Sequence, residues 1–296
     1  MANLKEISRQ IKSVKNTAKT TKAMKLVSSA KLRRTQQLSQ QAKSYALKIN
    51  EILSEIAARI GRVQESSENI SKAFIPNENP KTVDIVFVTA DKGLCGGFNM
   101  ATIKAVRELI EEYSSKGATV RLRAAGRKGI DYFNFQGRDL LDSIVGLTSA
   151  PTYEKASDFI AEAYEDFNNG TTDKVIMVYN GFLNMLTQEL RTKNLLPISL
   201  ESVSVEHELK SMLDVEPDDD EEILNELTSK YVDFNMYYSL IDSLAAEHSA
   251  RMQAMDNATN NAKDKVNDLT VEFNKARQAA ITTELIEIIS GVESMK

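Results

Sequence analysis

The chain has 296 residues and a mass of 33.0 kDa, enough for about two domains of ~150 residues each. Its 37 Lys and Arg against 42 Asp and Glu leave a net charge of −5, and 42% hydrophobic with 27% charged residues is typical of a soluble globular chain. One cysteine excludes an intramolecular disulfide, and two histidines exclude a three-histidine metal site. No stretch approaches the ~20 continuous apolar residues of a membrane span, and the charged start is unlike a signal peptide. We therefore expect a cytosol-facing chain with no metal, no cofactor and no inserted membrane segment.

Residues 1–48 form a strongly basic segment with the composition of a helix. They hold twelve lysines and arginines and one acidic residue, so the segment carries +11 in a chain whose total is −5. No glycine or proline precedes Gly61, and Ala, Lys, Gln and Leu are good helix formers. Apolar residues recur in alternating steps of three and four over 4–18 and again over 38–56. We predict one helix over residues 1–60, with a weaker apolar stripe over 19–37.

Residues 82–200 alternate between strand and helix patterns. Strands are predicted near 83–89, 119–125, 174–180 and 188–197, and helices near 101–114 and 153–167. Strands separated by helices are typical of a mainly parallel sheet with helices on its faces. The polar stretch 77–81 is interpreted as the linker that leads into this α/β domain.

The C-terminal third of the chain predicts a second long helix. Residues 201–222 are polar and acidic, and we interpret them as a solvated loop that also brings negative charge to the start of that helix. Residues 223–291 contain no glycine or proline before Gly291, and sixteen positions from Leu227 to Ala280 follow one heptad frame. The economical partner is the helix over 1–60. The sequence therefore predicts an antiparallel coiled coil of the two termini, with the α/β domain inserted between them.

The C-terminal helix is predicted to be longer than its partner, so its end needs another cover. Its last turns are apolar on more than one face: Ile281, Leu285, Ile286, Ile288, Ile289 and Val292. Soluble monomers seldom expose an apolar patch of this kind. We predict that another protein encloses this end.

A glycine-containing loop follows the first predicted strand, where a phosphate-binding loop would lie. Residues 89–99 read TADKGLCGGFN, and their glycines match neither G-x-G-x-x-G nor the P-loop. A tight turn or a protein contact is therefore favoured over nucleotide binding. The turn 126–129, Gly-Arg-Lys-Gly, could hold an anion, although a basic turn explains it equally well. Cys95 is interpreted as a small buried thiol rather than a nucleophile, and His248 as a packed seam residue.

Two functions remain open for the basic helix. Clustered Lys and Arg are typical of nucleic-acid binding. The same residues share their helix with heptad apolar positions, lack interleaved aromatic residues, and belong to a chain of net negative charge. A partner lined with carboxylates would fit as well as a phosphate backbone, and we favour the protein partner. A basic coiled-coil scaffold or nucleic-acid-binding protein is the alternative.

Three stretches resemble the gamma subunit of F-type ATP synthase. Residues 11–31 are similar to its N-terminal helix, residues 91–99 to its central motif, and residues 247–259 and 274–291 to its C-terminal signature. The resemblance covers both ends and the middle in the right order, and residues 130–225 carry little of it. It implies a Rossmann-like α/β domain inserted in the coiled coil, and the role of central rotor stalk.

The resemblance also implies the partners and the location. The coiled coil would lie in the bore of a hexamer of three alpha and three beta subunits, and the α/β domain would form a foot with the epsilon subunit on the ring of c subunits. Such a chain is not an enzyme on its own but couples proton translocation to ATP synthesis and hydrolysis and regulates the ATPase. It would be a peripheral protein on the cytoplasmic face of a bacterial inner membrane.

The family's functional positions are carried over residue by residue. Met24, Lys25 and Arg251 match positions near an acidic lever loop of beta, and Arg277 with Gln278 match a pair that meets a catch loop. The remaining matched positions are Thr282 and Glu284, on the next turn, and Asp91, Lys92, Gly93, Cys95, Gly96 and Gly97, in the foot. Two plainer interpretations stay open: Met24 as coiled-coil packing, and Arg251 as a partner of Glu247 four residues earlier.

Overall fold

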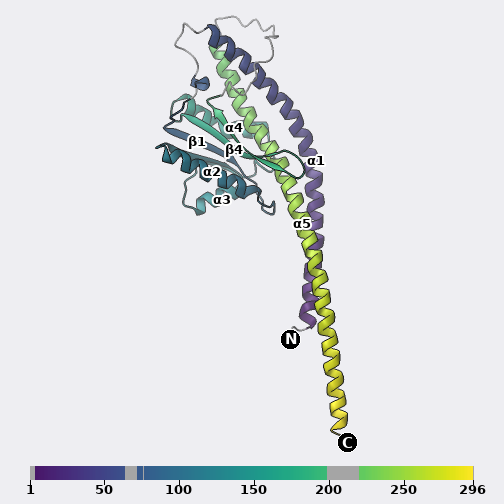
Figure 1. Ribbon diagram of the computed structural model, residues 1–296. Helices are drawn as coiled ribbons and strands as arrows, with labels where there is room; N and C mark the ends of the chain where they lie inside the picture. Colours follow the sequence, from purple (N-terminus) through teal and green to yellow (C-terminus); the bar gives the residue numbers. More distant parts are fainter. Residues whose placement is uncertain (1–3, 64–71, 76, 199–219, 296) are drawn as a thin grey trace. The chain divides into compact units, whose positions relative to one another are not determined.

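A computed structural model describes residues 4–63, 72–75, 77–198 and 220–295 (Figure 1). The acidic stretch 201–219 and His207 lie outside the described residues. Two compact units are present: residues 1–29 with 251–296, and residues 30–250. The helices α1 (Leu4–Val63) and α5 (Asp220–Glu293) contribute to both units, so the compact units do not coincide with the predicted boundaries between helix and α/β segments.

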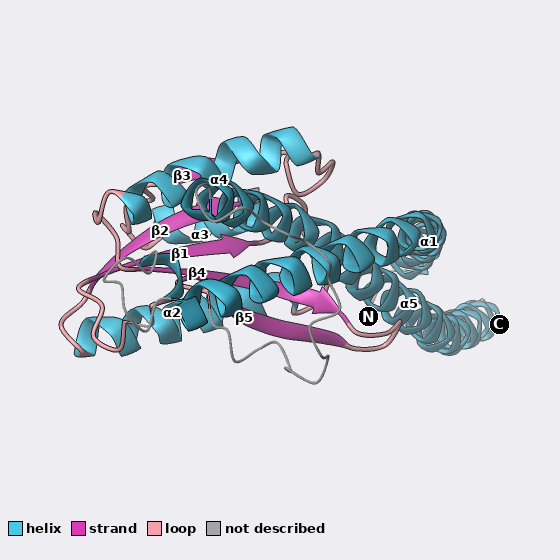
Figure 2. Cartoon of the chain, turned by 90° about the horizontal axis from the view of Figure 1, so that it is seen from above, coloured by secondary structure: helices cyan, strands magenta, loops and turns pink. Residues whose placement is uncertain are grey.

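The larger unit contains one five-stranded sheet in the order β3-β2-β1-β4-β5 (Figure 2). The strands β1 (Thr82–Val88), β2 (Thr119–Ala125), β3 (Asp142–Ile144) and β4 (Lys174–Phe182) run parallel, and β5 (Gln188–Leu196) pairs antiparallel with β4. The strands predicted from apolar patterns are all present. Three short elements were not predicted, because each is too short to carry a clear periodic pattern: the strand β3, the 3₁₀ turn Lys72–Phe74 and the helix α3 (Arg127–Phe135).

Helices cover both faces of the sheet. The helices α2 (Phe98–Ser115) and α3 (Arg127–Phe135) pack on the face that includes Ile85, Leu122 and Val178. The opposite face, which includes Val86 and Met177, is covered by α4 (Tyr153–Asn168) and by the part of α5 around Val232 and Met236. The predicted class, paired terminal helices with a central α/β sheet, is confirmed.

Within each unit the segments of α1 and α5 pack antiparallel. In the smaller unit the hydroxyls of Thr21 and Thr259 lie 2.7 Å apart. In the larger unit, Ala42 of α1 clusters with Phe234 and Ile241 of α5. Higher numbers on α1 meet lower numbers on α5, as an antiparallel pair requires.

The seam of α1 differs from the predicted apolar stripe. Of the apolar residues predicted over 38–56, Leu38 is exposed, and Tyr45 is also exposed although its ring centre lies 4.4 Å from that of Phe234 on α5, whereas Ala42 is buried. The buried positions instead keep the heptad frame of the first stripe through the stretch expected to be weak, and they are Ile7, Thr21, Ser28, Leu32, Thr35 and Ala42. Threonine and serine can be buried in a helix because their hydroxyls bond to a carbonyl one turn back, as that of Thr35 does to Lys31 O at 3.0 Å. A pattern that counts only apolar residues misses them.

The residue Lys193 of β5 is partly buried against α5 in the larger unit. Its Nζ donates to Asn235 Oδ1 at 2.6 Å and lies 5.3 Å from the centre of the Tyr231 ring. Burial lowers the pKa of Lys193 to about 8 from its usual 10.5. The buried cation opposes folding, because the unfolded chain holds this proton more tightly than the folded chain.

We predict that stability rises with pH through this lysine. Between about pH 8 and 10.5 the unfolded state binds more protons than the folded state, so the free energy of unfolding should increase over that window, by a few kcal/mol at most. Urea denaturation of the wild type and of Lys193→Met at pH 7 and pH 10 measures it. The variant should lack this increment, and Lys104→Met on exposed α2 should keep it. An equal pH response in all three chains would contradict the prediction.

Candidate functional site

The glycine-containing loop is held in place from both of its sides. Asn99 of α2 accepts a hydrogen bond from Ala90 N at 2.8 Å and directs its own amide to the Cys95 sulfur at 3.3 Å. The prediction of a buried thiol is confirmed, since Cys95 is 1% exposed. Between these anchors the exposed Leu94 has a φ of 63°, an uncommon conformation for a residue other than glycine. The loop is a fixed turn that exposes Lys92, Leu94 and Gly96.

The carboxylate of Asp91 occupies the position that an anion would take at this end of the sheet. It accepts hydrogen bonds from Arg127 N at 3.1 Å, Gly146 N at 3.2 Å and Ser149 Oγ at 2.7 Å. Burial of this carboxyl opposes its ionisation, but the hydrogen bonds outweigh that cost and hold the pKa of Asp91 below its usual value. One side chain thus joins the loops that follow β1, β2 and β3.

The backbone amides of the turn 126–129 are all used within the chain. Besides Arg127 N on Asp91, the amide of Lys128 donates to Ala90 O at 3.1 Å and that of Gly129 to Thr89 Oγ1 at 2.9 Å. Gly126 has a φ of 105°, and a Cβ there would lie 1.9 Å from Thr89 O. The glycines allow two loops to approach each other closely. This agrees with the plainer of the two interpretations, a basic turn without a bound anion.

The crevice at the carboxyl ends of β1 and β4 is filled by the protein itself. Ligands of open α/β sheets bind where the strand order reverses, which here is between these two strands. Ala246 and Ala250 of α5 pack there against Ala90, Cys95 and Phe98. Asn180 of β4 donates to Phe98 O at 2.7 Å and to Thr102 Oγ1 at 2.8 Å. The groups that a nucleotide would need are used internally, which disfavours the nucleotide-binding hypothesis.

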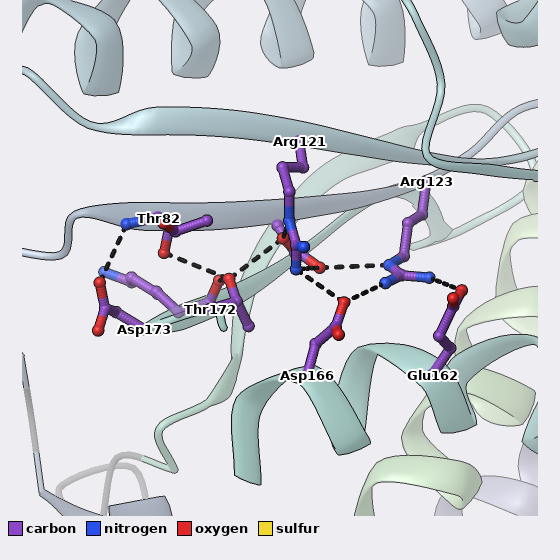
Figure 3. Close-up of polar contacts among 9 residues, drawn as sticks. Thr82, Arg121, Arg123, Glu162, Asp166, Thr172 and Asp173 are labelled. Atoms are coloured by element: carbon purple, nitrogen blue, oxygen red, sulfur yellow. Dashed lines mark hydrogen bonds and ion pairs between the residues drawn. The ribbon is translucent and has the colours of Figure 1, made fainter. Parts of the chain in front are cut away.

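A buried ion network beneath α4 was missed by sequence reasoning (Figure 3). Arg121 and Arg123 alternate with apolar residues along β2, a pattern typical of a solvated face. Instead the guanidinium of Arg123 is fully buried and contacts Asp84 at 3.2 Å and Asp166 at 2.7 Å, and Arg121 Nε contacts Asp84 at 2.6 Å. Burial alone would lower the pKa of both arginines, and the carboxylates raise it instead. The available signal was Asp84, an acidic residue inside an apolar strand.

The matched positions on the paired helices lie in the smaller unit. Met24, Lys25 and Arg251 are partly buried, and Lys25 Nζ contacts Asp256 Oδ1 at 2.7 Å. Half-exposed pairs of this kind contribute ~1 kcal/mol or less. The Lys25 ammonium is therefore engaged within the chain but available for exchange with another carboxylate. Arg277, Gln278, Thr282 and Glu284 lie further along α5, and all four are exposed.

The far end of α5 carries the exposed apolar residues that the sequence predicted. From Thr270 to Val292 no described side chain of α5 is buried, whereas Met255, Thr259, Ala262 and Leu269 are. Ile288 and Ile289 are 62% and 64% exposed. Figure 1 shows α5 continuing past the N-terminal end of α1. The prediction that this helix outlasts its partner is confirmed.

Two further classes of site are absent from the part of the chain that the structure covers. In those ranges, no three His, Cys, Asp or Glu side chains are grouped so as to hold a metal ion. Among the same residues, no helix combines the length and the apolar character needed to cross a bilayer. The structure thus describes two long helices whose segments pack antiparallel within each unit, and an α/β sheet in the larger unit.

Comparison with known proteins identifies the family of the chain. The family model described as ATP synthase matches residues 3–295. The ATP synthase gamma chain of Aliarcobacter butzleri is 69% identical over 297 aligned positions that cover 100% of both chains. That of Campylobacter curvus is 59% identical with the same coverage. The chain therefore belongs to the ATP synthase gamma chain family, whose members are non-catalytic subunits of the ATP synthase complex.

Solved structures agree with this assignment. The central stalk and c-ring structure of Tetrahymena thermophila mitochondrial ATP synthase contains a chain 27% identical, with a TM-score of 0.58, covering 81% of this chain and 99% of that one. A chain of the Euglena gracilis mitochondrial ATP synthase is 19% identical with a TM-score of 0.66, covering 99% and 94% respectively, and supports the fold alone.

We predict that Asp91 stabilises the α/β domain. Asp91→Asn should remove ~1–3 kcal/mol of unfolding free energy at pH 7, because it replaces a charged acceptor of several hydrogen bonds. The lowered pKa of Asp91 contributes stability that is present above pH 4 and lost as the pH falls below it, so the variant should also lose less stability on acidification. Urea denaturation at pH 7 and pH 3 measures both effects. Asp131→Asn, an exposed aspartate on α3, is the matched control and should change neither.

Proposed function

We propose that the chain is the central rotor shaft of a bacterial F-type ATP synthase, on the cytoplasmic face of the inner membrane. In this proposal the paired helices turn inside a hexamer of three alpha and three beta subunits. The α/β domain stands on the epsilon subunit and the ring of c subunits. Rotation driven by ion flow, with protons as the expected ion, is thereby coupled to ATP synthesis and hydrolysis.

The bare C-terminal stretch of α5 is the observation that carries this proposal. Six isoleucine, leucine and valine side chains between residues 281 and 292 are each about half exposed or more. At ~25 cal/mol per Å² of apolar surface, leaving such residues in water is costly, and soluble monomers seldom do so. An apolar collar around a turning helix would cover this surface without fixing one orientation, because apolar contacts are not directional.

The charge of the smaller unit supports acidic partners around the shaft. Lys5, Arg9, Lys12, Lys15, Lys19 and Lys22 are exposed along the start of α1, where Glu6 is the sole acidic residue of residues 4–29. Loops with carboxylates would be attracted to each of these side chains in turn. In water such exposed pairs contribute ~1 kcal/mol or less each, so they can form and break as the shaft moves.

Rotation would act through differential contact rather than chemistry. One side of the paired segment presents basic α1, and beyond it α5 is bare on every side, so the shaft has an uneven profile. A partner subunit that has open and closed states is shifted toward whichever state makes better contacts with the side of the shaft that faces it. Each beta subunit would meet a different side at each step, and its nucleotide site would open or close accordingly. Arg277 and Gln278 are proposed to contact beta at the bare stretch of α5. Met24, Lys25 and Arg251 are proposed to contact beta where α1 and α5 are paired.

The exposed loop after β1 supports a contact surface on the α/β domain. Lys92, Leu94, Gly96 and Gly97 are exposed, while Asp91 and Cys95 hold the loop from within. This division assigns Asp91 and Cys95 a supporting role rather than direct contact. Nothing in the geometry favours the alternative of nucleic-acid binding, and the gamma chain relatives argue against it.

We predict that the chain enters a complex with alpha and beta subunits in one copy per three of each. Mixing the purified subunits, followed by mass measurement and an ATPase assay, tests this prediction. Steady-state hydrolysis should rise several-fold over that of alpha and beta alone. A chain that instead bound duplex DNA with strong salt dependence, and left the hexamer unchanged, would establish the scaffold alternative.

We also predict that Arg277→Ala with Gln278→Ala lowers ATP turnover while the complex still assembles. Both side chains are exposed, so folding should not change, and a loss of ~1.4 kcal/mol of contact in the rate-limiting step would slow turnover about tenfold. Gln136→Ala with Arg138→Ala, an exposed pair of the same types on the α/β domain, is the matched control. Turnover unchanged by the first pair, or lowered equally by both, would remove the role assigned to Arg277 and Gln278.

A further inference from the structure

Three polar side chains of α5, spaced one heptad apart, face the β4–β5 hairpin in the larger unit. They are Asn235, Asp242 and Ser249, and they are 4%, 2% and 0% exposed. None lies on the heptad frame that packs against α1, which passes through the preceding residues Phe234, Ile241 and His248. The row is therefore a second, polar seam on the same helix, directed at the sheet.

Each member of this row bonds to the hairpin. Asn235 Oδ1 accepts from Lys193 Nζ at 2.6 Å, and Asp242 Oδ2 accepts from Arg191 at 2.6 Å. Ser249 Oγ donates to Met185 O at 2.8 Å and lies 3.3 Å from the amide of Gln188. From residue 188 to residue 193 of β5, the bonded residues of α5 run in the opposite direction, from 249 to 235. The row therefore extends along the contact between β5 and α5.

Asp242 is the centre of the row, because several elements meet at its carboxylate. Besides Arg191 of β5, the amide of Phe182 at the end of β4 donates to Oδ1 at 3.4 Å. Burial raises the pKa of Asp242, and Arg191 together with Ser39 and Lys43 of α1 counteracts this by favouring the ionised carboxylate. Gly181 leaves room for the pair, since a Cβ there would lie 2.6 Å from both the Arg191 guanidinium and Asp242 Oδ2.

Directional contacts of this kind resist a motion that apolar packing allows. Apolar residues such as Tyr231, Met236 and Leu240 also join α5 to the sheet. Packed helices can shift past one another by about one turn and repack in a new register. The buried carboxylate of Asp242 cannot follow such a shift without losing Arg191, and a buried charge left unpaired is strongly unfavourable. Buried polar residues set register in helical assemblies for the same reason.

We propose that the Asn235–Asp242–Ser249 row locks α5 to the β4–β5 hairpin and carries torque between the α/β domain and the C-terminal helix. This inference rests on the proposed rotor function and assigns positioning roles to Asp242, Arg191 and Gly181. The row converts rotation of the domain into rotation of the helix without slippage. The apolar core supplies the adhesion, and the polar row supplies the register.

The test separates torsional stiffness from stability. In the assembled complex with alpha and beta subunits, a bead is attached either to the α/β domain through Phe135→Cys, which is 86% exposed, or to α5 itself through Glu226→Cys, also exposed. Angular fluctuations of the bead in a stalled complex report the stiffness between the hexamer and the attachment point. Native Cys95 is 1% exposed and should not compete for the label.

The variant Arg191→Met with Asp242→Leu removes the charges as a pair. Replacing both partners by apolar residues of similar size is often neutral or stabilising, so the thermal midpoint and assembly should be kept. Stiffness measured through residue 135 should fall at least twofold, and stiffness through residue 226 should not change. If this variant fails to fold, Lys193→Met with Asn235→Leu makes the same test one heptad away. Lys104→Met with Glu108→Leu on exposed α2 is the control and should alter neither reading.

The possible outcomes decide between the hypotheses. Unchanged stiffness through residue 135 in both row variants would overturn the lock. An equal loss at both attachment points would also overturn it, because the softening would then lie in the helices. If the wild-type complex shows no rotation at all under ATP, the proposed function fails, and that result is distinct from either of the others.

Discussion

Neither α1 nor α5 could be stable alone in water, since helices in proteins owe most of their stability to the burial of one face. Each buries one face against the other, and α5 buries a second face against the sheet. The pairing closes a loop of more than 150 residues, and the sheet domain lies within that loop. Because both helices are continuous, packing at one position constrains the register at every other position on the same helix.

The two packed faces of α5 have different roles: one holds the helix in place by burying apolar area, and the other fixes its register. Toward α1 the helix presents Phe234, Ile241 and, further along, Thr259 and Leu269, which bury area with few directional bonds. Toward the hairpin it presents a polar side chain once per heptad, with Asp242 paired to Arg191. Apolar contacts have no preferred direction and permit close packing of long helices. Hydrogen bonds and ion pairs bury little area, but they are directional and select one register. A shaft that transmits rotation needs both properties, and it needs no reactive group.

The loop after β1 illustrates why a motif alone does not define a site. Its place after a strand suggested phosphate binding, and its spacing argued against that chemistry. In the structure this loop instead binds the neighbouring turn 126–129: Asp91 accepts the amide of Arg127, and Ala90 O and Thr89 Oγ1 accept those of Lys128 and Gly129. A carboxylate from the chain thus replaces an external anion. Resemblance to the gamma family marked these positions as a motif, and the geometry separates the residues that support the loop from those that it exposes.

The sequence by itself determined the two long helices, the main strands, the fold class and the bare end of α5, because each depends on local periodicity or on length. It did not determine that Thr21, Ser28 and Thr35 continue the seam, that Arg123 is buried beneath α4, or that Asp242 is the centre of a polar row. Those outcomes depend on which charged or hydroxyl group from a distant segment arrives opposite each side chain. A periodic pattern shows which face of an element is buried, but a polar residue can be buried only if its partner is also brought there. That was decided by the tertiary structure alone.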